Sequence, residues 1–370
     1  MRLHDHIIGL VVILALSACA PRGTITIAPE AADVGTVRQI YLATSRGVAD
    51  LPDRFGSDRA EKMSFARYDV SVPPVRKEGS VSFVGRDKVD PTTQMLTVDE
   101  RVYPREADFQ TALGQSLQQS AASRRVIVFV HGFNNTYAEG LYRSVQLAHD
   151  LNVTSTVVHF SWPSSANALG YVHDRDSTLF SRDPLEDLLG DIAATGASEI
   201  VLVAHSMGAL LSMETLRSMA LRGDTATMRK LSAVILISPD IDVDVFRSQM
   251  AAIPAPPQPF VIFGSPRDLM LKMSARITGA SERLGNLSDG TAIADLPVTY
   301  VDVGAFRDGN GHFSFATSPE LLAVIQQLSL AQGWLAAEGR RTDNPITGIL
   351  LRTQDASRVI LSPLRVYGQQ

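Results

Sequence analysis

The chain has 370 residues, enough for one large α/β domain or for two ordinary ones. Hydrophobic residues make up 45% and charged residues 20% of it, which is typical of a globular protein and excludes collagen-like, coiled-coil and disordered classes. The formal net charge is -5, and lysine and arginine form no cluster in the sequence. Nucleic acid is therefore not an expected partner, because binding to phosphates needs a clustered basic surface.

The first segment, residues 1–18, is predicted to be a signal peptide. Residues 7–16 form an apolar run of about ten residues, which is too short to span a bilayer, since that takes about 20. The following Leu16-Ser17-Ala18-Cys19 resembles the bacterial lipobox, in which the cysteine is diacylated and becomes the first residue of the mature protein. The alternative is an uncleaved anchor in which Cys19 is only a small buried side chain.

Cys19 is the only cysteine of the chain, which excludes an internal disulfide and a cysteine-based metal site. A protein exported to an oxidising compartment benefits from carrying no spare thiol. We therefore expect a protein of the bacterial cell envelope, held to the membrane through lipidated Cys19 on the periplasmic side. Ala20, rather than aspartate, follows the cysteine, which favours the outer membrane in a Gram-negative bacterium.

The mature chain is predicted to have three parts. Residues 19–36 are rich in Ala, Pro, Gly and Thr and are expected to be a tether. Residues 37–335 are expected to form one domain. Residues 336–370 are a C-terminal extension, polar at first and apolar again at residues 359–364.

The domain is predicted to begin with strands at residues 37–43 and 67–72, separated by a charged, glycine-containing stretch at residues 55–62. From residue 125 onward, strands and helices alternate. The predicted strands are residues 126–130, 155–160, 199–204, 233–237, 259–263 and 298–303. The predicted helices are residues 137–151, 184–194, 207–222 and 319–330. This alternation indicates the α/β class, with a mostly parallel sheet, helices on both faces and right-handed connections.

The strongest local motif is Ala204-His205-Ser206-Met207-Gly208, which lies between a predicted strand and a predicted helix. The nucleophile elbow is written Gly-x-Ser-x-Gly, because its strained turn brings strand and helix backbones close together. Ala204 departs from that pattern by one methyl group. The alternative is that Ser206 is a helix N-cap.

A serine nucleophile needs a base within hydrogen-bond reach and a third group that orients the base. In this arrangement the chain order is serine, acid, histidine, and His312 is the only one of eight histidines downstream of Ser206. It ends the glycine-containing loop Asp308-Gly309-Asn310-Gly311-His312. The alternative is a surface histidine without a catalytic role.

Two residues are candidates for the acid. Asp268 follows the predicted strand at residues 259–263 and is preferred, and Asp240 follows the strand before it. Asp268 could instead pair with Arg267 or cap the helix that starts there.

The oxyanion of an acyl-transfer reaction needs preorganised N–H donors. The sequence predicts the backbone N–H groups of Met207 and Phe133, the latter in the loop His131-Gly132-Phe133-Asn134. His131 is expected to hold this loop by hydrogen bonds, and His205 to be a packing residue. Trp162 and Asn134 are candidate pocket residues, and a core position is an equal alternative for Trp162.

Taken together, five segments resemble a bacterial α/β-hydrolase family within the esterase and lipase superfamily, a group of unknown function often found on lipoproteins. These segments are His131-Gly132-Phe133-Asn134-Asn135, Phe160-Ser161-Trp162-Pro163-Ser164, Ala204-His205-Ser206-Met207-Gly208, Ser238-Pro239-Asp240-Ile241-Asp242 and Gly311-His312. Tyr41-Leu42-Ala43-Thr44-Ser45-Arg46 is also similar to the N-terminal strand of the family. The resemblance covers residues 37–330 and implies the α/β-hydrolase fold and a serine hydrolase.

The sequence thus predicts a carboxylic ester hydrolase that works through an acyl-enzyme, acts on a small-molecule or lipid ester, and needs no metal or organic cofactor. About 20 residues separate two late strands, which leaves no room there for a large cap and predicts an open pocket. The sequence indicates no particular oligomeric state. The alternatives are an inactive binding or scaffolding lipoprotein with the same fold, and a haloperoxidase-like or lyase-like activity.

Overall fold

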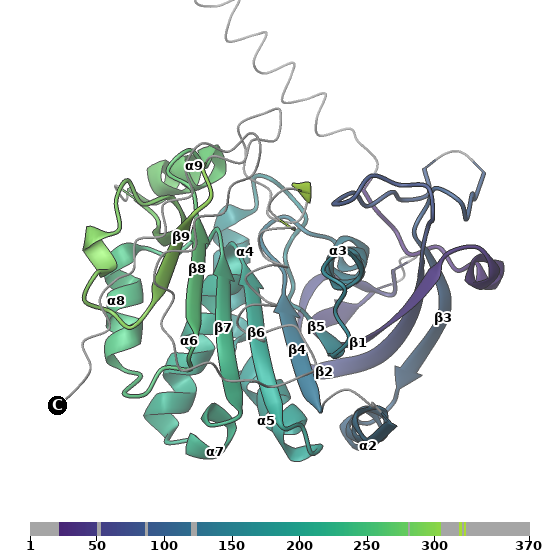
Figure 1. The fold of residues 1–370 in the computed structure, drawn as a ribbon, viewed down its shortest axis with the longest axis horizontal. Coiled ribbons are helices and arrows are strands. Elements are labelled where there is room, and N and C mark those ends of the chain that lie inside the picture. The colour runs from purple at the N-terminus through teal and green to yellow at the C-terminus, as the bar shows by residue number, and fades with distance from the viewer. Residues whose placement is uncertain are drawn as a thin grey trace, which may run out of the picture.

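The computed structural model describes residues 22–49, 53–85, 88–119, 124–279, 282–304, 318–319 and 322. The predicted signal peptide, Cys19, His312, the predicted C-terminal extension and most of the last predicted helix lie outside these ranges. Within them, the chain forms a nine-stranded sheet in the order β3-β2-β1-β5-β4-β6-β7-β8-β9 (Figure 1). No helix of the described part is long and apolar enough to cross a membrane.

The strands are β1 (Thr36–Val48), β2 (Phe55–Val72), β3 (Leu96–Tyr103), β4 (Arg125–Val130), β5 (Thr156–Ser161), β6 (Glu199–His205), β7 (Leu231–Ile237), β8 (Phe260–Gly264) and β9 (Thr299–Asp302). The α-helices are α2 (Glu106–Gln119), α3 (Tyr137–Asp150), α4 (Tyr171–Phe180), α5 (Arg182–Ala194), α6 (Met207–Arg222), α7 (Thr225–Met228), α8 (Val243–Ala251) and α9 (Leu269–Thr278). Short 3-10 helices are η1 (Pro29–Asp33), η2 (Leu284–Asn286) and η3 (Thr291–Ile293).

The sheet is mostly parallel, as predicted. β1 and β4 to β9 run in one direction, and β2 is antiparallel to both of its neighbours. All six residues of β4 and all five of β8 are buried, since helices cover both faces of the sheet. Alternate residues of β4 point to opposite faces: Val128 packs in the core with α2, α5 and α6, and Phe129 packs in the core with α3.

The expected separator at residues 55–62 is instead part of β2, which continues the ladder with β1 as far as the Val48–Phe55 pair. Its polar composition suggested a loop because this end of the strand pair is largely solvated, so few apolar side chains are needed. Helices α2, α4, α7 and α8 and strand β3 were not predicted from the sequence, and α9 was considered only as a helix that Asp268 could cap. The buried face of α4 carries Asp174, Ser177 and Thr178, which give no apolar periodicity, and α2 buries only a narrow row that includes Phe109 and Leu113.

The N-terminal segment contacts the domain earlier than the expected boundary at residue 37. The N–H of Ala28 donates to the carbonyl of Thr97 at 2.8 Å, and the N–H of Thr97 donates to Thr26 at 2.9 Å. Ala31 in η1 is fully buried. A single β-bridge and a 3-10 turn have no sequence periodicity, so the segment resembled a tether although residues from Arg22 onward pack on the domain.

Replacing Phe109 with alanine should lower the free energy of unfolding by about 3 to 5 kcal/mol, measured by urea denaturation. The fully buried Phe109 ring lies 4.8 Å from the ring of Phe65 and 5.9 Å from those of Tyr41 and Tyr103, measured between centroids, so its loss leaves a cavity under β1 to β3. Thr111→Ala, at an exposed position of the same helix, should change stability by less than about 0.5 kcal/mol. Equal effects of the two substitutions would contradict this account of α2.

Candidate active site

Ser206 lies at the turn between β6 and α6, with φ 53° and ψ -122°. A positive φ is strained for any residue with a side chain, and it persists only where the surrounding structure imposes it. The Ser206 side chain makes no capping hydrogen bond to α6, so the N-cap interpretation has no support. The backbone has the strained geometry of a nucleophile elbow.

Close packing around this turn explains its small residues. A Cβ added to Gly208 would lie 2.7 Å from the carbonyl oxygen of Val130, and one added to Gly132 would lie 2.9 Å from Cβ of Ser206. Ala204, the departure from the usual motif, is fully buried, and its methyl group packs in the core shared with α6. Glycine is thus needed where the backbones of α6 and the loop after β4 meet, whereas position 204 has room for one methyl group.

His131 holds the loop after β4, as predicted. Its buried ring has Nδ1 2.9 Å from the carbonyl oxygen of Gly132 and Nε2 3.1 Å from that of Trp162. Burial, together with the charge of Arg46, keeps the pKa of His131 well below its ordinary value. The imidazole is therefore neutral near pH 7 and donates its single N–H to one of these two carbonyl oxygens.

Trp162 is a core residue. Its side chain is fully buried, stacks on His131 with ring centroids 4.9 Å apart, and donates from Nε1 to the carbonyl of His131 at 2.7 Å. Of the two interpretations of Trp162, the structure therefore supports packing.

The two predicted oxyanion donors are the backbone N–H groups of Phe133, in the loop after β4, and of Met207, at the start of α6. Within the described residues, neither the N–H of Phe133 nor that of Met207 donates a hydrogen bond to the protein. The Asn135 side chain donates to the carbonyls of Gly132 at 3.1 Å and Phe133 at 2.8 Å, which fixes the peptide units of this loop. Both N–H groups are thus available to an anion.

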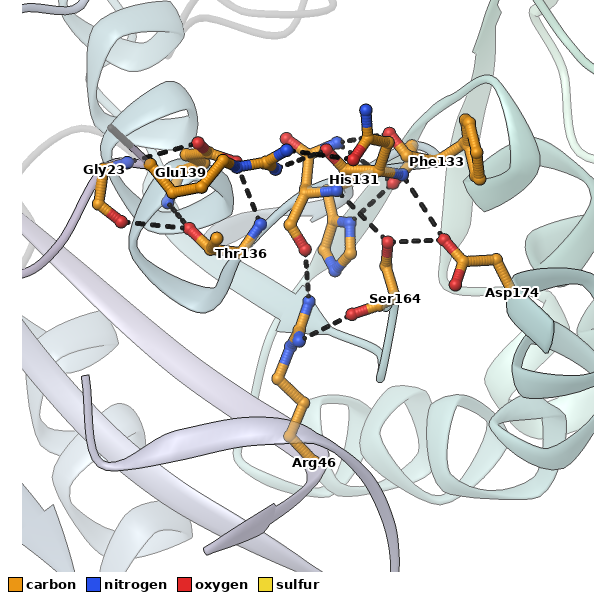
Figure 2. Close-up of polar contacts among 12 residues, drawn as sticks. Gly23, Arg46, His131, Phe133, Thr136, Glu139, Ser164 and Asp174 are labelled. Carbon is orange, nitrogen blue, oxygen red and sulfur yellow. Dashed lines mark hydrogen bonds and ion pairs between the residues drawn. The ribbon is translucent and has the colours of Figure 1, made fainter. Parts of the chain in front are cut away.

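Arg46, near the end of β1, lies beneath the loop that follows β4 and is the centre of a hydrogen-bond network (Figure 2). Its guanidinium is buried and donates to four acceptors on three segments, which are the carbonyls of Gly56, Asn135 and Ser164 and the hydroxyl of Ser161, at 2.9 to 3.0 Å. Burial lowers the pKa of Arg46 to about 10, so the side chain stays charged at neutral pH. It connects the loops that follow β4 and β5.

Asp174 on α4 holds the same two loops. Its fully buried carboxylate accepts hydrogen bonds from the Ser164 hydroxyl and the Ser165 N–H, both at 2.6 Å, and from the Asn134 N–H at 3.3 Å. The Ser164 hydroxyl in turn accepts from the N–H of Asn135 at 3.1 Å. A buried cation and a buried anion together fix the loop that carries Phe133 (Figure 2).

The side chain of Asn134 is engaged by the N-terminal segment. Arg22 donates from Nη1 to Asn134 Oδ1 at 3.0 Å and from Nη2 to the Asn134 carbonyl at 2.8 Å, and it pairs with Glu139 at 2.5 Å. Asn134 also has a positive φ of 58°. Its partners are therefore protein groups at the outer side of the loop.

The two candidate acids have different surroundings. Asp268 is buried after β8, and its Oδ1 caps α9 by accepting from the N–H groups of Met270 at 3.0 Å and Leu271 at 3.1 Å. Asp240 is buried after β7 and has both carboxylate oxygens occupied: Oδ1 by Ser274 at 2.5 Å and Arg283 at 3.2 Å, and Oδ2 by Tyr171 at 3.1 Å. Burial raises the pKa of Asp240. Asp240 is thus committed to a structural network.

His312 lies outside the described residues, so the structure describes Ser206, the two candidate acids and the oxyanion loop but not the predicted base. Within the described ranges, no group of three His, Cys, Asp or Glu side chains is placed to hold a metal ion. Sequence reasoning missed the roles of Arg46, Asp174 and Asn135. A lone charge at the end of the buried strand β1 is the signal that could have found Arg46, because a buried charge requires partners.

Comparison with known proteins gives a family match. The model of a family described as "Alpha/beta hydrolase of unknown function (DUF900)" matches residues 105–329, more than half of the chain. The match includes β4 to β9 and positions 206, 268 and 312. No curated protein matches the sequence.

Several solved structures are similar at low identity. A predicted CIB-like hydrolase from Thermoplasma acidophilum has 18% identity and a TM-score of 0.34, covering 56% of this chain and 87% of that one. A propionate-bound esterase, Est2, from Thermogutta terrifontis has 12% identity and a TM-score of 0.33, covering 74% and 92%. The same esterase phosphorylated by paraoxon has 12% identity and a TM-score of 0.36, covering 73% and 90%.

Replacing Arg46 with lysine should reduce kcat for a soluble model ester by about 10- to 100-fold and leave KM within a few-fold, measured by steady-state kinetics. A lysine ammonium is a single point of charge and cannot bridge the acceptors on three segments, so the Phe133 donor is displaced, and losing such a donor costs about 100-fold or more. Arg54→Lys, in an exposed ion pair with Glu100, should leave kcat within about two-fold.

Ser164→Ala gives an independent test should the Arg46 variant fail to fold. It removes the hydroxyl that joins Asp174 to the N–H of Asn135, and kcat should fall by about 10-fold with little change in KM. Folded Arg46→Lys and Ser164→Ala proteins with unchanged kcat would contradict the positioning role of this network.

Proposed function

Because the chain belongs to the family of α/β hydrolases of unknown function, we propose that it is a serine hydrolase that cleaves carboxylic esters through an acyl-enzyme. The observation that carries the proposal is the strained Ser206 turn, placed beside two backbone N–H groups without protein partners in the described part of the chain. The positive φ of Ser206 destabilises the fold, and the Ser206 side chain does not cap a helix. A purely structural role therefore does not explain the strain.

In the proposed reaction, Ser206 Oγ attacks the ester carbonyl while the His312 imidazole takes its proton. The N–H groups of Met207 and Phe133 stabilise the negative charge that develops on the carbonyl oxygen. Collapse of the tetrahedral intermediate breaks the bond to the alcohol, which leaves with the proton from His312. Water then attacks the acyl-enzyme by the same steps in reverse, releasing the carboxylic acid and restoring Ser206.

Asp268 is the proposed partner of His312. It follows β8, and β9 follows it in both sequence and sheet order, so its position suits a histidine located after β9. Asp240 has both carboxylate oxygens bonded to Tyr171, Ser274 and Arg283, which suits a structural role for it.

We also propose that the protein acts in the bacterial cell envelope, anchored on the periplasmic side through acylated Cys19, and at the outer membrane if the source is Gram-negative. The support is the lipobox-like Leu16-Ser17-Ala18-Cys19 after a short apolar run, together with the lack of any other cysteine.

A fluorophosphonate probe should label the folded protein covalently, and Ser206→Ala should abolish the labelling, read by mass spectrometry. The matched control is Ser238→Ala, because Ser238, like Ser206, has a positive φ, of 43°. It should retain labelling. Labelling that persists in Ser206→Ala would overturn Ser206 as nucleophile, and a folded wild type that never labels would favour a binding protein.

Replacing Asp268 with asparagine should lower kcat on the order of 1,000-fold or more, because an amide does not stabilise the imidazolium. Asparagine is as good a helix cap as aspartate, so the stability of α9 should be preserved. Asp240→Asn should instead destabilise the protein by about 3 to 5 kcal/mol by leaving buried Arg283 without its anion, with a smaller effect on kcat of the folded fraction. The reverse ranking of the two kcat values would assign the acid to Asp240.

A further inference from the structure

The outer face of α9 carries large apolar side chains in contact with solvent. Leu269, Met270, Met273 and Ile277 are 54%, 47%, 54% and 53% exposed, and their spacing places them on one side of the helix. The opposite side buries Leu271, Ser274 and Ala275 against the domain. A helix that is apolar on its exposed face and is also packed on its inner face indicates a further contact.

Two further exposed apolar side chains lie on either side of Tyr171, at the start of α4. Leu169 is 93% exposed and Val172 is 68% exposed. Tyr171, between them, bonds through its hydroxyl to Ser274 of α9 at 2.8 Å, and its ring lies 5.8 Å from that of Phe133. We call these six exposed side chains the apolar rim: Leu169, Val172, Leu269, Met270, Met273 and Ile277.

The rim lies beside the candidate active site. Asp268 is the N-cap of α9. Tyr171, which lies between Leu169 and Val172, bonds to Ser274 of α9 and packs on Phe133 of the oxyanion loop. Figure 1 shows α9 at the carboxyl ends of β8 and β9 and α7 at the other end of the sheet. A ligand that contacts the rim is therefore at the mouth of the site.

The N-terminal segment is fixed at this same edge. Besides the bonds of Arg22, the N–H of Gly23 donates to Glu139 at 3.3 Å and its carbonyl accepts from Thr136 at 3.2 Å, at the start of α3 (Figure 2). Cys19 precedes Arg22 by three residues, which span at most about 11 Å. An acyl chain on Cys19 would hold the carboxyl edge of the sheet within that distance of a membrane.

We propose that the apolar rim docks on a lipid bilayer and that the substrate is an ester of a membrane lipid, drawn from that bilayer to Ser206. The proposal rests on the function proposed above. Exposed Lys272 and Arg276 lie among the apolar residues of α9, a combination that suits a bilayer with anionic head groups. The bilayer is favoured over a second copy or another part of this chain because Arg22 fixes the tether at the same edge.

Docking can be measured with a fluorophore attached to an introduced cysteine. Only that cysteine should react with the label, because acylation blocks the thiol of Cys19, the only native cysteine. The full lipidated chain with Ile277→Cys, labelled with NBD, is reconstituted in vesicles of phosphatidylethanolamine and phosphatidylglycerol. Its emission should shift to the blue and be quenched by doxyl-labelled lipid. The control, Ala226→Cys in α7 at the opposite end of the sheet, should show neither change.

Three outcomes of the fluorescence experiment overturn the docking. One is an aqueous fluorophore at both positions. A second is shielding at position 277 that depends on protein concentration and not on the lipid quencher, which means a second copy. A third is the same shielding in detergent at every concentration, which means another part of this chain. Labelling of the protein without an introduced cysteine would show a free Cys19 and remove the tether from the argument.

Activity on two esters separates docking from hydrolysis. The double substitution Met273→Glu and Ile277→Glu should reduce hydrolysis of a long-chain glycerolipid in the same vesicles by about 10-fold or more, since it puts anions on the membrane face. Hydrolysis of soluble p-nitrophenyl butyrate should stay within about two-fold. Leu221→Glu, which is 63% exposed near the end of α6, is the control and should affect neither.

Equal losses on both esters, or no loss on either, would overturn the role of the rim. A wild type that hydrolyses the soluble ester while position 277 stays aqueous would retain the hydrolase and reject the docking. Insertion of the fluorophore at position 277, combined with a wild type that hydrolyses neither ester, would retain the docking and reject the proposed function.

Discussion

Burying a guanidinium is costly unless its N–H groups find acceptors, and Arg46 finds them on three segments that are far apart in the sequence. Because these acceptors belong to β2 and to the loops after β4 and β5, satisfying one side chain fixes the positions of all three. Asp174 completes the arrangement from α4 by bonding to Ser164 and Ser165 of the loop after β5. The Ser206 turn packs directly on one of these loops, through Gly132 and Gly208, and inherits its position from them.

The parts of the fold that were predictable from the sequence are those in which burial repeats with the period of the backbone. The strands β4, β6, β7 and β8 are continuous apolar runs because both of their faces are covered, and α6 was predicted with its observed bounds. α4 was missed because its buried face is polar, with Asp174 bonded to backbone groups of another segment. A helix that buries hydrogen bonds in place of apolar surface has no periodicity to read.

The site shows the same limit in its chemistry. The Ser206 turn, the loop with His131 and the two acids were found from the sequence because motif and chain order constrain them. The structure counts against Asp240 because its two carboxylate oxygens are bonded to Tyr171, Ser274 and Arg283, which are distant from it in the sequence. Likewise, nothing in the pattern around residue 22 shows that Arg22 bonds to Asn134, 112 residues later. Such contacts exist only after the chain has folded.

The backbone at Ser206 has a further consequence for how this protein can change. Glycine is the residue that would adopt φ 53° at least cost, so the amino acid best suited to the turn is one that lacks the hydroxyl. Selection for stability alone would therefore erode position 206, and selection for turnover must oppose it there. At this turn, folding and chemistry favour different side chains. At positions 132 and 208, by contrast, close packing requires glycine and no side-chain chemistry opposes it.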